Sequence, residues 1–242
     1  MAADQDTWVA GVDGCPGGWL VILRGLHTGT LNHCLKPVFE EILALSFHPD
    51  VVAVDMPIGL LDAAEKGGRA CDRAARVLLG DRGCCVFSPP VRSALRCVDY
   101  ASACQTNSSS SKAAISLSQQ AFGLFQKLRE VHAQIKPKTQ DQVFEVHPEL
   151  AFYELNQQSA MQERKKSSAG FAARRSLLMQ AGFAETIDEM LTTYQRQKVA
   201  RDDILDACVC CWTAERIWRK KALRIPEDPP EDSRGLRMEI WR

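Results

Sequence analysis

WVAGVDGCPGGW occupies residues 8–19 and VVAVDMPIG occupies residues 51–59, and these two stretches decide the fold. Each is an apolar run, rich in β-branched residues, that ends in one aspartate, Asp13 or Asp55, followed by glycine or a nearby proline. Apolar runs of this length with turn residues after them predict buried strands. A carboxylate at the end of such a strand lies at the rim of the sheet, where ligands and metals bind. Two such aspartates, from two strands, can converge on one cation.

The residues around and between these stretches predict three strands, a helix and a fourth strand. Turn residues separate the first two strands and favour a hairpin. Val38, Ile42 and Leu45 fall on one face of a helix. The predicted elements are strands at 7–13, 19–24, 31–35 and 51–55, with the helix at 38–46. This order opens a ribonuclease-H-like sheet, and it also opens each half of the actin and sugar-kinase architecture.

The rest of the chain predicts an insertion and then a return to the sheet. Two segments with helical spacing of apolar residues flank a segment rich in Pro and Ser. The Pro- and Ser-rich segment predicts a loop. The expected elements are helices at 62–80 and 114–135, a loop at 83–111, a fifth strand at 141–146, helices at 165–180, 184–195 and 201–220, and a solvated tail at 226–235. We therefore predict one α/β domain over residues 1–242. It holds a ribonuclease-H-like five-stranded mixed sheet flanked by helices, with a helical insertion after strand four, at about 60–138.

Composition is that of an ordinary globular protein and narrows the possible partners. Of the 242 residues, 45% are hydrophobic and 25% charged, and the formal net charge is zero. Because there is no global positive field, any site for a polyanion must be a local patch. No apolar run is long enough for a membrane span and no signal-peptide pattern is visible, so we expect no membrane partner. The ten cysteines form no paired CxxC motifs, which argues against zinc and favours reduced thiols in a cytoplasmic protein.

A further acidic group lies at the start of the last predicted helix, in RDDILDA at residues 201–207. Asp203 and Asp206 are three positions apart, so they share one helix face. Asp202 suits the first turn, where the helix dipole favours an acid. Hydrophobic residues flank Asp206, which predicts that its carboxylate turns inward and needs a partner or a metal.

The fifth predicted strand adds Glu145, His147 and Glu149, which alternate in EVHPE. On a strand they share one face, although Pro148 favours an end to the strand before Glu149. Oxygen-rich clusters with an occasional histidine suit Mg²⁺ or Mn²⁺, and two such ions can drive phosphodiester hydrolysis. We expect the metal ligands to be Asp13, Asp55, Glu145, Asp203 and Asp206, with His147 or Glu149 as the base that activates water or orients it.

Six motifs in order carry a resemblance to a known family. They are GVDGCPGGW (11–19), VDMPIGL (54–60), RACDRAAR (69–76), SLSQQAF (116–122), EVHPELAF (145–152) and RDDILDAC (201–208). From about residue 8 to 240 the chain resembles the DUF429 family, which is regarded as a predicted nuclease group of ribonuclease-H-like fold. By analogy with resolvase-type nucleases of that fold, the resemblance implies that Asp13, Asp55, Asp203 and Asp206 are the catalytic acids. Such nucleases often carry glutamate where this chain has Asp55.

Basic residues at helical spacing predict a phosphate clamp. Arg69, Arg73 and Arg76 form one stripe, which is either a solvated helix face or, if it faces the acids, a set of bidentate phosphate ligands. Arg92, Gln119 or Gln120, and the Lys165-Lys166 pair would extend this clamp.

Three functions remain open on the sequence. The first is a metal-dependent phosphodiester hydrolase, or nuclease, acting on nucleic acid or nucleotides. The second is an actin or sugar-kinase-like phosphotransferase, because GVDG followed by two glycines resembles the phosphate loop of that fold; the short chain argues against its two duplicated halves. The third is a non-catalytic protein that binds a nucleotide or small ligand, which the neutral net charge favours over long DNA.

Overall fold

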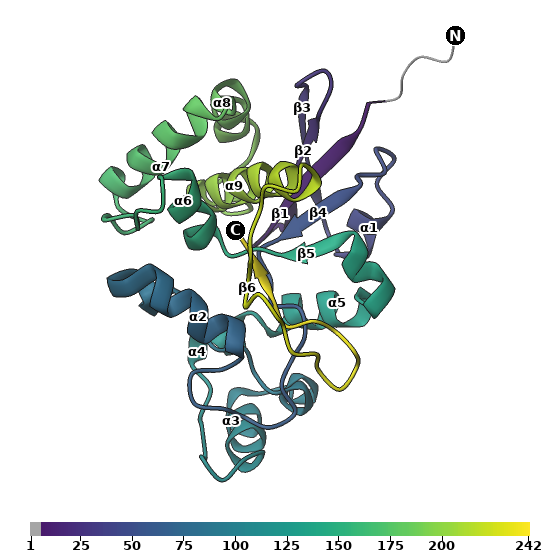
Figure 1. Ribbon diagram of the computed structural model, residues 1–242, viewed down its shortest axis with the longest axis vertical. Helices are drawn as coiled ribbons and strands as arrows, with labels where there is room; N and C mark the ends of the chain where they lie inside the picture. Colours follow the sequence, from purple (N-terminus) through teal and green to yellow (C-terminus); the bar gives the residue numbers. More distant parts are fainter. Residues whose placement is uncertain (1–5) are drawn as a thin grey trace. The chain divides into compact units, whose positions relative to one another are not determined.

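The computed structural model describes residues 6–242, and the described chain forms two compact units (Figure 1). The first consists of the chain up to Asp55, Gln142–Leu223 and the last two residues. The second consists of Met56–Asp141 and Arg224–Ile240. The insertion predicted at about 60–138 falls within the second unit.

A five-stranded mixed sheet forms the centre of the first unit, and this confirms the predicted α/β fold class. The strand order is β3-β2-β1-β4-β5. Strands β1, β2 and β3 are antiparallel, whereas β4 runs parallel to both β1 and β5. Their bounds are Trp8–Cys15 (β1), Gly18–Gly25 (β2), Leu31–Lys36 (β3), Val51–Val54 (β4) and Val143–Glu145 (β5).

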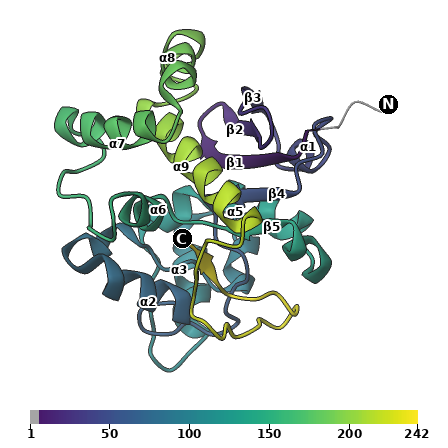
Figure 2. The ribbon, with the colours of Figure 1, turned by 45° about the horizontal axis from the view of Figure 1, so that its top comes forward.

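Helices pack on both faces of this sheet. Helix α9 lies along β1 on one face (Figure 2). On the opposite face, the Trp19 ring of β2 meets the ring of Phe39, just before α1, at a centroid distance of 5.0 Å. The helices of the first unit are α1 (Glu40–Leu43), α6 (Pro148–Leu155), α7 (Ser168–Gln180), α8 (Ala184–Thr193) and α9 (Arg201–Trp218).

The contact between α9 and β1 depends on a glycine. A Cβ atom at Gly11 would lie 2.0 Å from the backbone nitrogen of Cys211 and 2.3 Å from the carbonyl oxygen of Ala207. No side chain fits at those distances, so only glycine lets the helix backbone approach the strand so closely.

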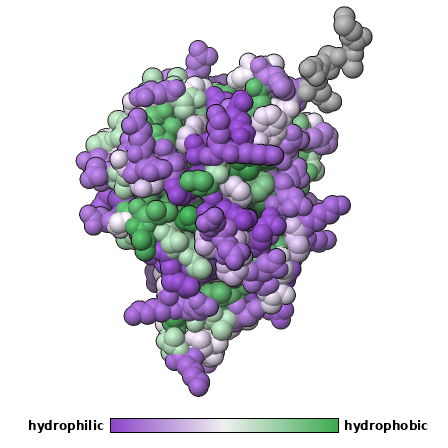
Figure 3. Space-filling model, in the orientation of Figure 1, coloured by the Kyte–Doolittle hydropathy of each residue, from purple (hydrophilic) through white to green (hydrophobic). Residues whose placement is uncertain are grey.

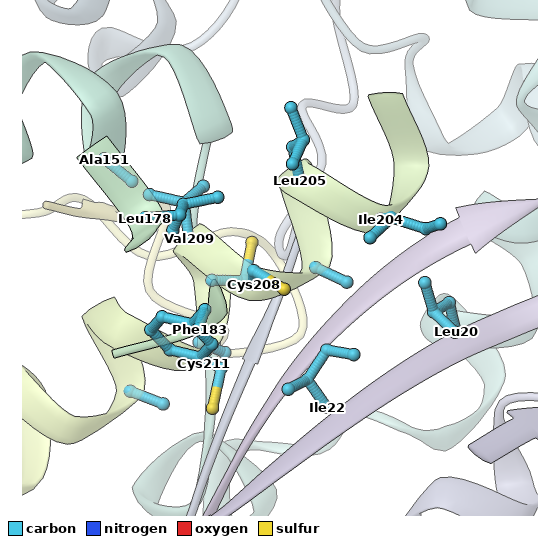
Figure 4. Packing of buried hydrophobic residues seen from close by; sticks show 14 of the residues in the cluster. Leu20, Ile22, Ala151, Leu178, Phe183, Ile204, Leu205, Cys208, Val209 and Cys211 are labelled. Atoms are coloured by element: carbon cyan, nitrogen blue, oxygen red, sulfur yellow. The ribbon is translucent and has the colours of Figure 1, made fainter. Parts of the chain in front are cut away.

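Around this contact, side chains from α9, β2 and the α7–α8 region form the hydrophobic core (Figure 4). Cys208 and Cys211 of α9 are fully buried beside Ile22 and Phe183, as small apolar residues. All ten cysteines are free thiols.

Helix α6 was not predicted, and α1 is shorter than expected. Strand β5 already ends at Glu145, before Pro148, and Pro148 is the first residue of a helix, where its fixed φ is favourable and its missing N–H costs nothing. Glu149 therefore lies on α6 and not on the strand with Glu145.

The second unit is more regular than the sequence suggested. Asp99 caps α3 by accepting a hydrogen bond from Ser102 N, so the segment predicted as a loop at 83–111 contains a helix. Ser118 caps α4 in the same way, and the long helix predicted at 114–135 is divided at Leu124. The elements are α2 (Ala70–Leu79), α3 (Tyr100–Ser109), α4 (Gln119–Gly123), α5 (Phe125–Gln134) and three short 3-10 helices, Gly80–Cys85, Arg92–Arg96 and Pro137–Asp141. Strands β6 (Arg224–Ile225) and β7 (Ile240–Trp241) pair near the C-terminus.

The surface carries mainly polar side chains. Figure 3 shows one face on which hydrophilic residues predominate and hydrophobic residues form separate patches. Among residues 6–242, no helix combines the length and the apolar character needed to cross a bilayer.

The close approach of α9 to β1 makes a stability prediction. Gly11→Ala should lower the free energy of unfolding by about 2–4 kcal/mol, because the added methyl group forces two backbones apart. Chemical denaturation of both proteins measures the difference. Gly123→Ala is the control, since a Cβ there meets no atom within 4 Å and alanine favours the helix. Equal denaturation midpoints for Gly11→Ala and the wild type would contradict the proposed role of the glycine.

Candidate functional site

Two strands and one helix bring four aspartates together in the first unit. Asp13 lies on β1, and Asp55 directly follows β4. The two strands are parallel neighbours, and Asp55 N donates to Val12 O at 2.9 Å, so both carboxylates lie at one edge of the sheet. Helix α9 contributes Asp203 and Asp206 from its first two turns. We call Asp13, Asp55, Asp203 and Asp206 the acidic cluster.

Burial and mutual repulsion raise the pKa values in the acidic cluster. The pKa of Asp13 is raised well above its ordinary value by burial and by the carboxyls of Asp55 and Asp206. Burial, with Asp206 next, raises the pKa of Asp55 to about 8. Burial also raises the pKa of Asp206, which is only 2% exposed. Asp206 thus opposes the ionisation of both Asp13 and Asp55, in addition to the effect of burial.

Asp203 also stabilises the start of α9. Its Oδ2 accepts a hydrogen bond from Ala200 N at 2.8 Å, which satisfies a backbone donor that the helix leaves open. The sequence favoured Asp202 for a place in the first turn, and Asp202 does lie there, but the capping carboxylate is Asp203. Burial raises the pKa of Asp203 to about 6 in spite of this hydrogen bond.

A lysine ammonium reaches into the acidic cluster. Lys165 Nζ lies 2.6 Å from Asp206 Oδ2 and 3.8 Å from Asp202 Oδ2. Although burial disfavours its charged form, the carboxylates of Asp206 and Asp13 raise the pKa of Lys165. The sequence placed Lys165 only in a phosphate clamp. Its contact with the acids joins residues 41 positions apart, and no local pattern predicts it.

The residues around the end of β5 take different places. Glu145 is buried as the last residue of β5, paired in register with Val54, and its charge contributes to the raised pKa of Asp55. His147 immediately precedes α6. Glu149 is also buried, and its Oε1 accepts a hydrogen bond from Arg174 Nη2 at 2.6 Å. Glu149 thus lies on a helix and holds an internal ion pair, while its catalytic role and that of His147 stay predictions.

Of the residues predicted to bind phosphate, Lys165 and Lys166 belong to the first unit, and the four arginines and Gln119 belong to the second. Arg69 is buried and precedes α2 rather than lying on it; it pairs with Asp72 at 2.7 Å and donates to the carbonyls of Ile58 and Gly59. Arg76 donates to Val86 O and to Ser88 Oγ. These guanidinium groups stabilise the loops of the second unit.

The other three residues of the second unit that are predicted to bind phosphate differ in their partners and in their exposure to solvent. Arg92 forms ion pairs with Asp62 and Asp232 at 3.0 and 2.8 Å. Arg73 pairs with Glu65 and keeps 44% of its side chain exposed, and Gln119 is exposed as the first residue of α4. The role of all five in phosphate binding stays a prediction.

The acidic cluster offers only carboxylate oxygens as possible ligands of a metal ion. Carboxylate oxygens are the ligands that Mg²⁺ and Mn²⁺ prefer. The Lys165 ammonium, which donates to Asp206 Oδ2, already places one positive charge beside this carboxyl. Within residues 6–242, however, no group of three or more His, Cys, Asp or Glu side chains is arranged to hold a metal ion. Coordination would therefore require the carboxylates to close around the ion.

Comparison with known proteins gives one match. The family described as "Protein of unknown function (DUF429)" matches residues 11–231. No curated protein and no solved structure matches the chain.

The raised pKa values predict that the metal-free protein loses stability as the pH rises. A carboxyl with a higher pKa in the folded state than its ordinary 3.8 binds its proton more tightly when folded. Its contribution is complete below about pH 4 and is lost as the pH passes the folded-state values, about 6 for Asp203 and about 8 for Asp55. Asp55→Asn should therefore raise the melting temperature at pH 9 by about 2–4 °C, on the order of 1 kcal/mol, and change it little at pH 5.

Thermal melts in the presence of a chelator test this at both pH values. The exposed Asp50 supplies the control variant, Asp50→Asn, which should behave as the wild type at either pH. A variant at Asp55 that is less stable than the wild type at pH 9 would show that the Asp55 charge is compensated in the folded protein.

Proposed function

Since the chain belongs to the DUF429 family, whose description assigns no activity, we propose from its own site that the protein is a metal-dependent phosphodiester hydrolase, nuclease-like in chemistry. The observation that carries this proposal is the placement of Asp13 and Asp55 at the ends of neighbouring parallel strands and at one edge of the sheet, where Asp206 raises the pKa of both. Buried carboxyls that oppose one another's ionisation cost stability unless a cation compensates them. Such a cost is typical of a functional site.

The residues that would hold Mg²⁺ or Mn²⁺ are Asp13, Asp55 and Asp206, with Asp203 and Glu145 at the edge. When bound, the ion supplies Lewis-acid stabilisation of the negative charge that develops on a phosphodiester. In this proposal the buried aspartates position the ion, and the sheet edge limits the access of water.

For the proton transfer, we favour His147 over Glu149. Glu149 holds Arg174 by a short ion pair, so removing its charge would leave a buried guanidinium without its carboxylate. A histidine is suited to accept a proton from water at neutral pH. Among the five residues proposed to bind phosphate, Arg73 and Gln119 are the exposed ones, and they are the best placed to meet a substrate from solvent.

Two alternatives remain. A non-catalytic protein that binds a nucleotide or small ligand is favoured by the Lys165 ammonium, which already compensates Asp206 without any ion. An actin or sugar-kinase-like phosphotransferase would need two such sheets, whereas the part of the chain described here has a single five-stranded sheet and a two-stranded one.

Metal binding should stabilise the folded protein. At a manganese concentration ten times the Kd, mass action predicts about 1.4 kcal/mol, which is a rise in melting temperature of about 3–6 °C. Asp13→Asn and Asp55→Asn should remove this rise because each takes away a ligand charge, while Asp50→Asn should keep it. Melts with and without millimolar manganese measure the effect. An unchanged wild-type midpoint would contradict a metal site.

Hydrolysis should depend on Asp13. Asp13→Asn keeps the shape of the side chain and loses the charge, so we expect activity to fall by at least about 100-fold while the fold is retained. The assay uses single-stranded and branched nucleic acids, short oligonucleotides and nucleotides, with manganese present and Asp50→Asn as the matched control. If the wild type and Asp13→Asn are equally inactive on every substrate, a binding role replaces the hydrolase.

A further inference from the structure

A surface pocket of about 480 Å³ lies in the first unit, where the end of α9 meets the β2–β3 hairpin. Its charged lining consists of Arg24 from β2, Glu215 and Arg216 from α9, and Arg219 and Lys221 just after α9. Four of these five groups are cations, whereas the whole chain carries a formal net charge of zero. Positive charge is therefore concentrated at this pocket.

The pocket lies far from the acidic cluster. Asp206 is near the start of α9 and Arg219 follows its end, so at about 1.5 Å per residue about 20 Å separates them along the helix axis. Arg24 pairs in register with Val9, near the start of β1, whereas Asp13 lies near the end of that strand. The pocket and the acidic cluster are thus at opposite ends of both β1 and α9.

Contacts within the first unit hold the Arg24 guanidinium at the pocket wall. Its Nη1 forms an ion pair with Glu215 Oε2 at 2.9 Å, and its Nη2 donates to the Ala181 carbonyl at 3.0 Å. The guanidinium carbon also lies 4.5 Å from the centre of the Phe183 ring. Because Arg24 belongs to a strand, the attraction of cations to the C-terminal end of a helix does not account for its position.

The backbone at the end of α9 makes its own hydrogen bonds. Lys221 N donates to Arg216 O at 2.8 Å and Lys220 N donates to Ile217 O at 3.0 Å, which are the two hydrogen bonds of a Schellman motif. These carbonyls therefore have partners other than the cationic side chains of the pocket.

One carboxylate in the lining serves two guanidinium groups. Glu215 Oε2 pairs with Arg24, and Glu215 Oε1 pairs with Arg219 at 2.8 Å. A single negative charge holds both arginines in place and neutralises only one of them. The pocket therefore keeps a surplus of positive charge after its internal ion pairs are counted.

Arg216 is the least compensated of the three arginines. Its guanidinium lies 4.7 Å from the centre of the Trp212 ring and donates to the Lys221 carbonyl at 3.0 Å. Its ion pair with Glu154 is long, at 3.7 Å, and Glu154 also meets Arg242. Within the described chain, residues 6–242, the buried Nε of Arg216 has no hydrogen-bond partner. Burial lowers the pKa of Arg216, because its charge is partly removed from water.

We propose that this pocket binds a ligand with adjacent phosphate groups, either a free polyphosphate, as in a nucleoside triphosphate, or successive phosphates of a nucleic acid strand. Guanidinium groups bind phosphate oxygens through paired N–H donors. The four cations of the lining exceed its single carboxylate by three charges, which suits several phosphate charges better than one carboxylate. The pocket uses no residue of the acidic cluster, so this inference does not rest on the proposed metal-dependent function.

Calorimetry in a metal-free buffer of low salt tests the proposal, with inorganic triphosphate as one probe and a short oligothymidylate as the other. The wild type should bind at least one probe, with a Kd that rises with salt. Arg216→Gln should weaken binding at least about tenfold, because it removes the least compensated guanidinium. Lys221→Gln should weaken it about threefold, and its exposed side chain makes this variant safe for folding.

Two control variants separate the pocket from the rest of the unit. Lys198→Gln removes an exposed positive charge of the first unit outside the pocket, and it should bind the probes as the wild type does. Asp13→Asn should also keep the wild-type affinity, because the acidic cluster takes no part in this binding. The failure of this inference and the failure of the proposed hydrolase are therefore distinguishable.

The probe that binds more tightly, and whose binding the pocket variants weaken, identifies the source of the phosphate groups. If the wild type binds neither probe at millimolar concentration, the proposal is overturned. Equal affinity of the wild type and Arg216→Gln would also overturn it, because the phosphates would then bind elsewhere. If Arg216→Gln does not fold, Lys221→Gln decides in the same way.

Discussion

The close packing of α9 against β1 is the contact on which the rest of the first unit depends. At Gly11 the backbone of the strand meets the backbone of the helix, at Ala207 and Cys211. Because Ala207 directly follows Asp206, this contact sets where the helix carboxylate lies relative to the carboxylate on the strand. The same helix supplies the apolar face that forms the core (Figure 4). Core and acidic cluster are therefore placed by one element.

The acidic cluster is costly to the folded protein, and several features of the chain reduce that cost. Burying carboxyls raises their pKa values, so part of the charge can be removed by protonation. Asp203 uses a backbone N–H of the helix start, and Asp206 uses the ammonium of Lys165. That ammonium is held by a segment that the Glu149–Arg174 pair braces. The negative charge of these carboxyls is therefore compensated by groups of the same unit that lie next to them in space.

Arginine has a different use in the second unit. Arg69 and Arg76 direct their guanidinium groups to carbonyl oxygens of loops, and Arg92 joins two aspartates. Five donors in a planar fork allow one side chain to hold several loop carbonyls at once. In a unit built from short helices and irregular segments, such contacts replace part of the backbone hydrogen bonding that a sheet provides. A stripe of arginines in a sequence can therefore indicate internal bracing as well as a binding face.

The sequence by itself predicted the five strands of the sheet and the last helix, because apolar runs bounded by turn residues and a period of 3.6 residues are local signals. It also determined that Asp13 and Asp55 would lie at one edge, since both follow apolar runs in neighbouring parallel strands. It did not determine α6, which begins at Pro148, or the start of α4, where Ser118 caps the helix. Only the tertiary structure decided that Lys165 meets Asp206 and that Glu149 meets Arg174. These contacts join distant segments through irregular backbone, and their geometry follows from packing, which no local pattern of residues encodes.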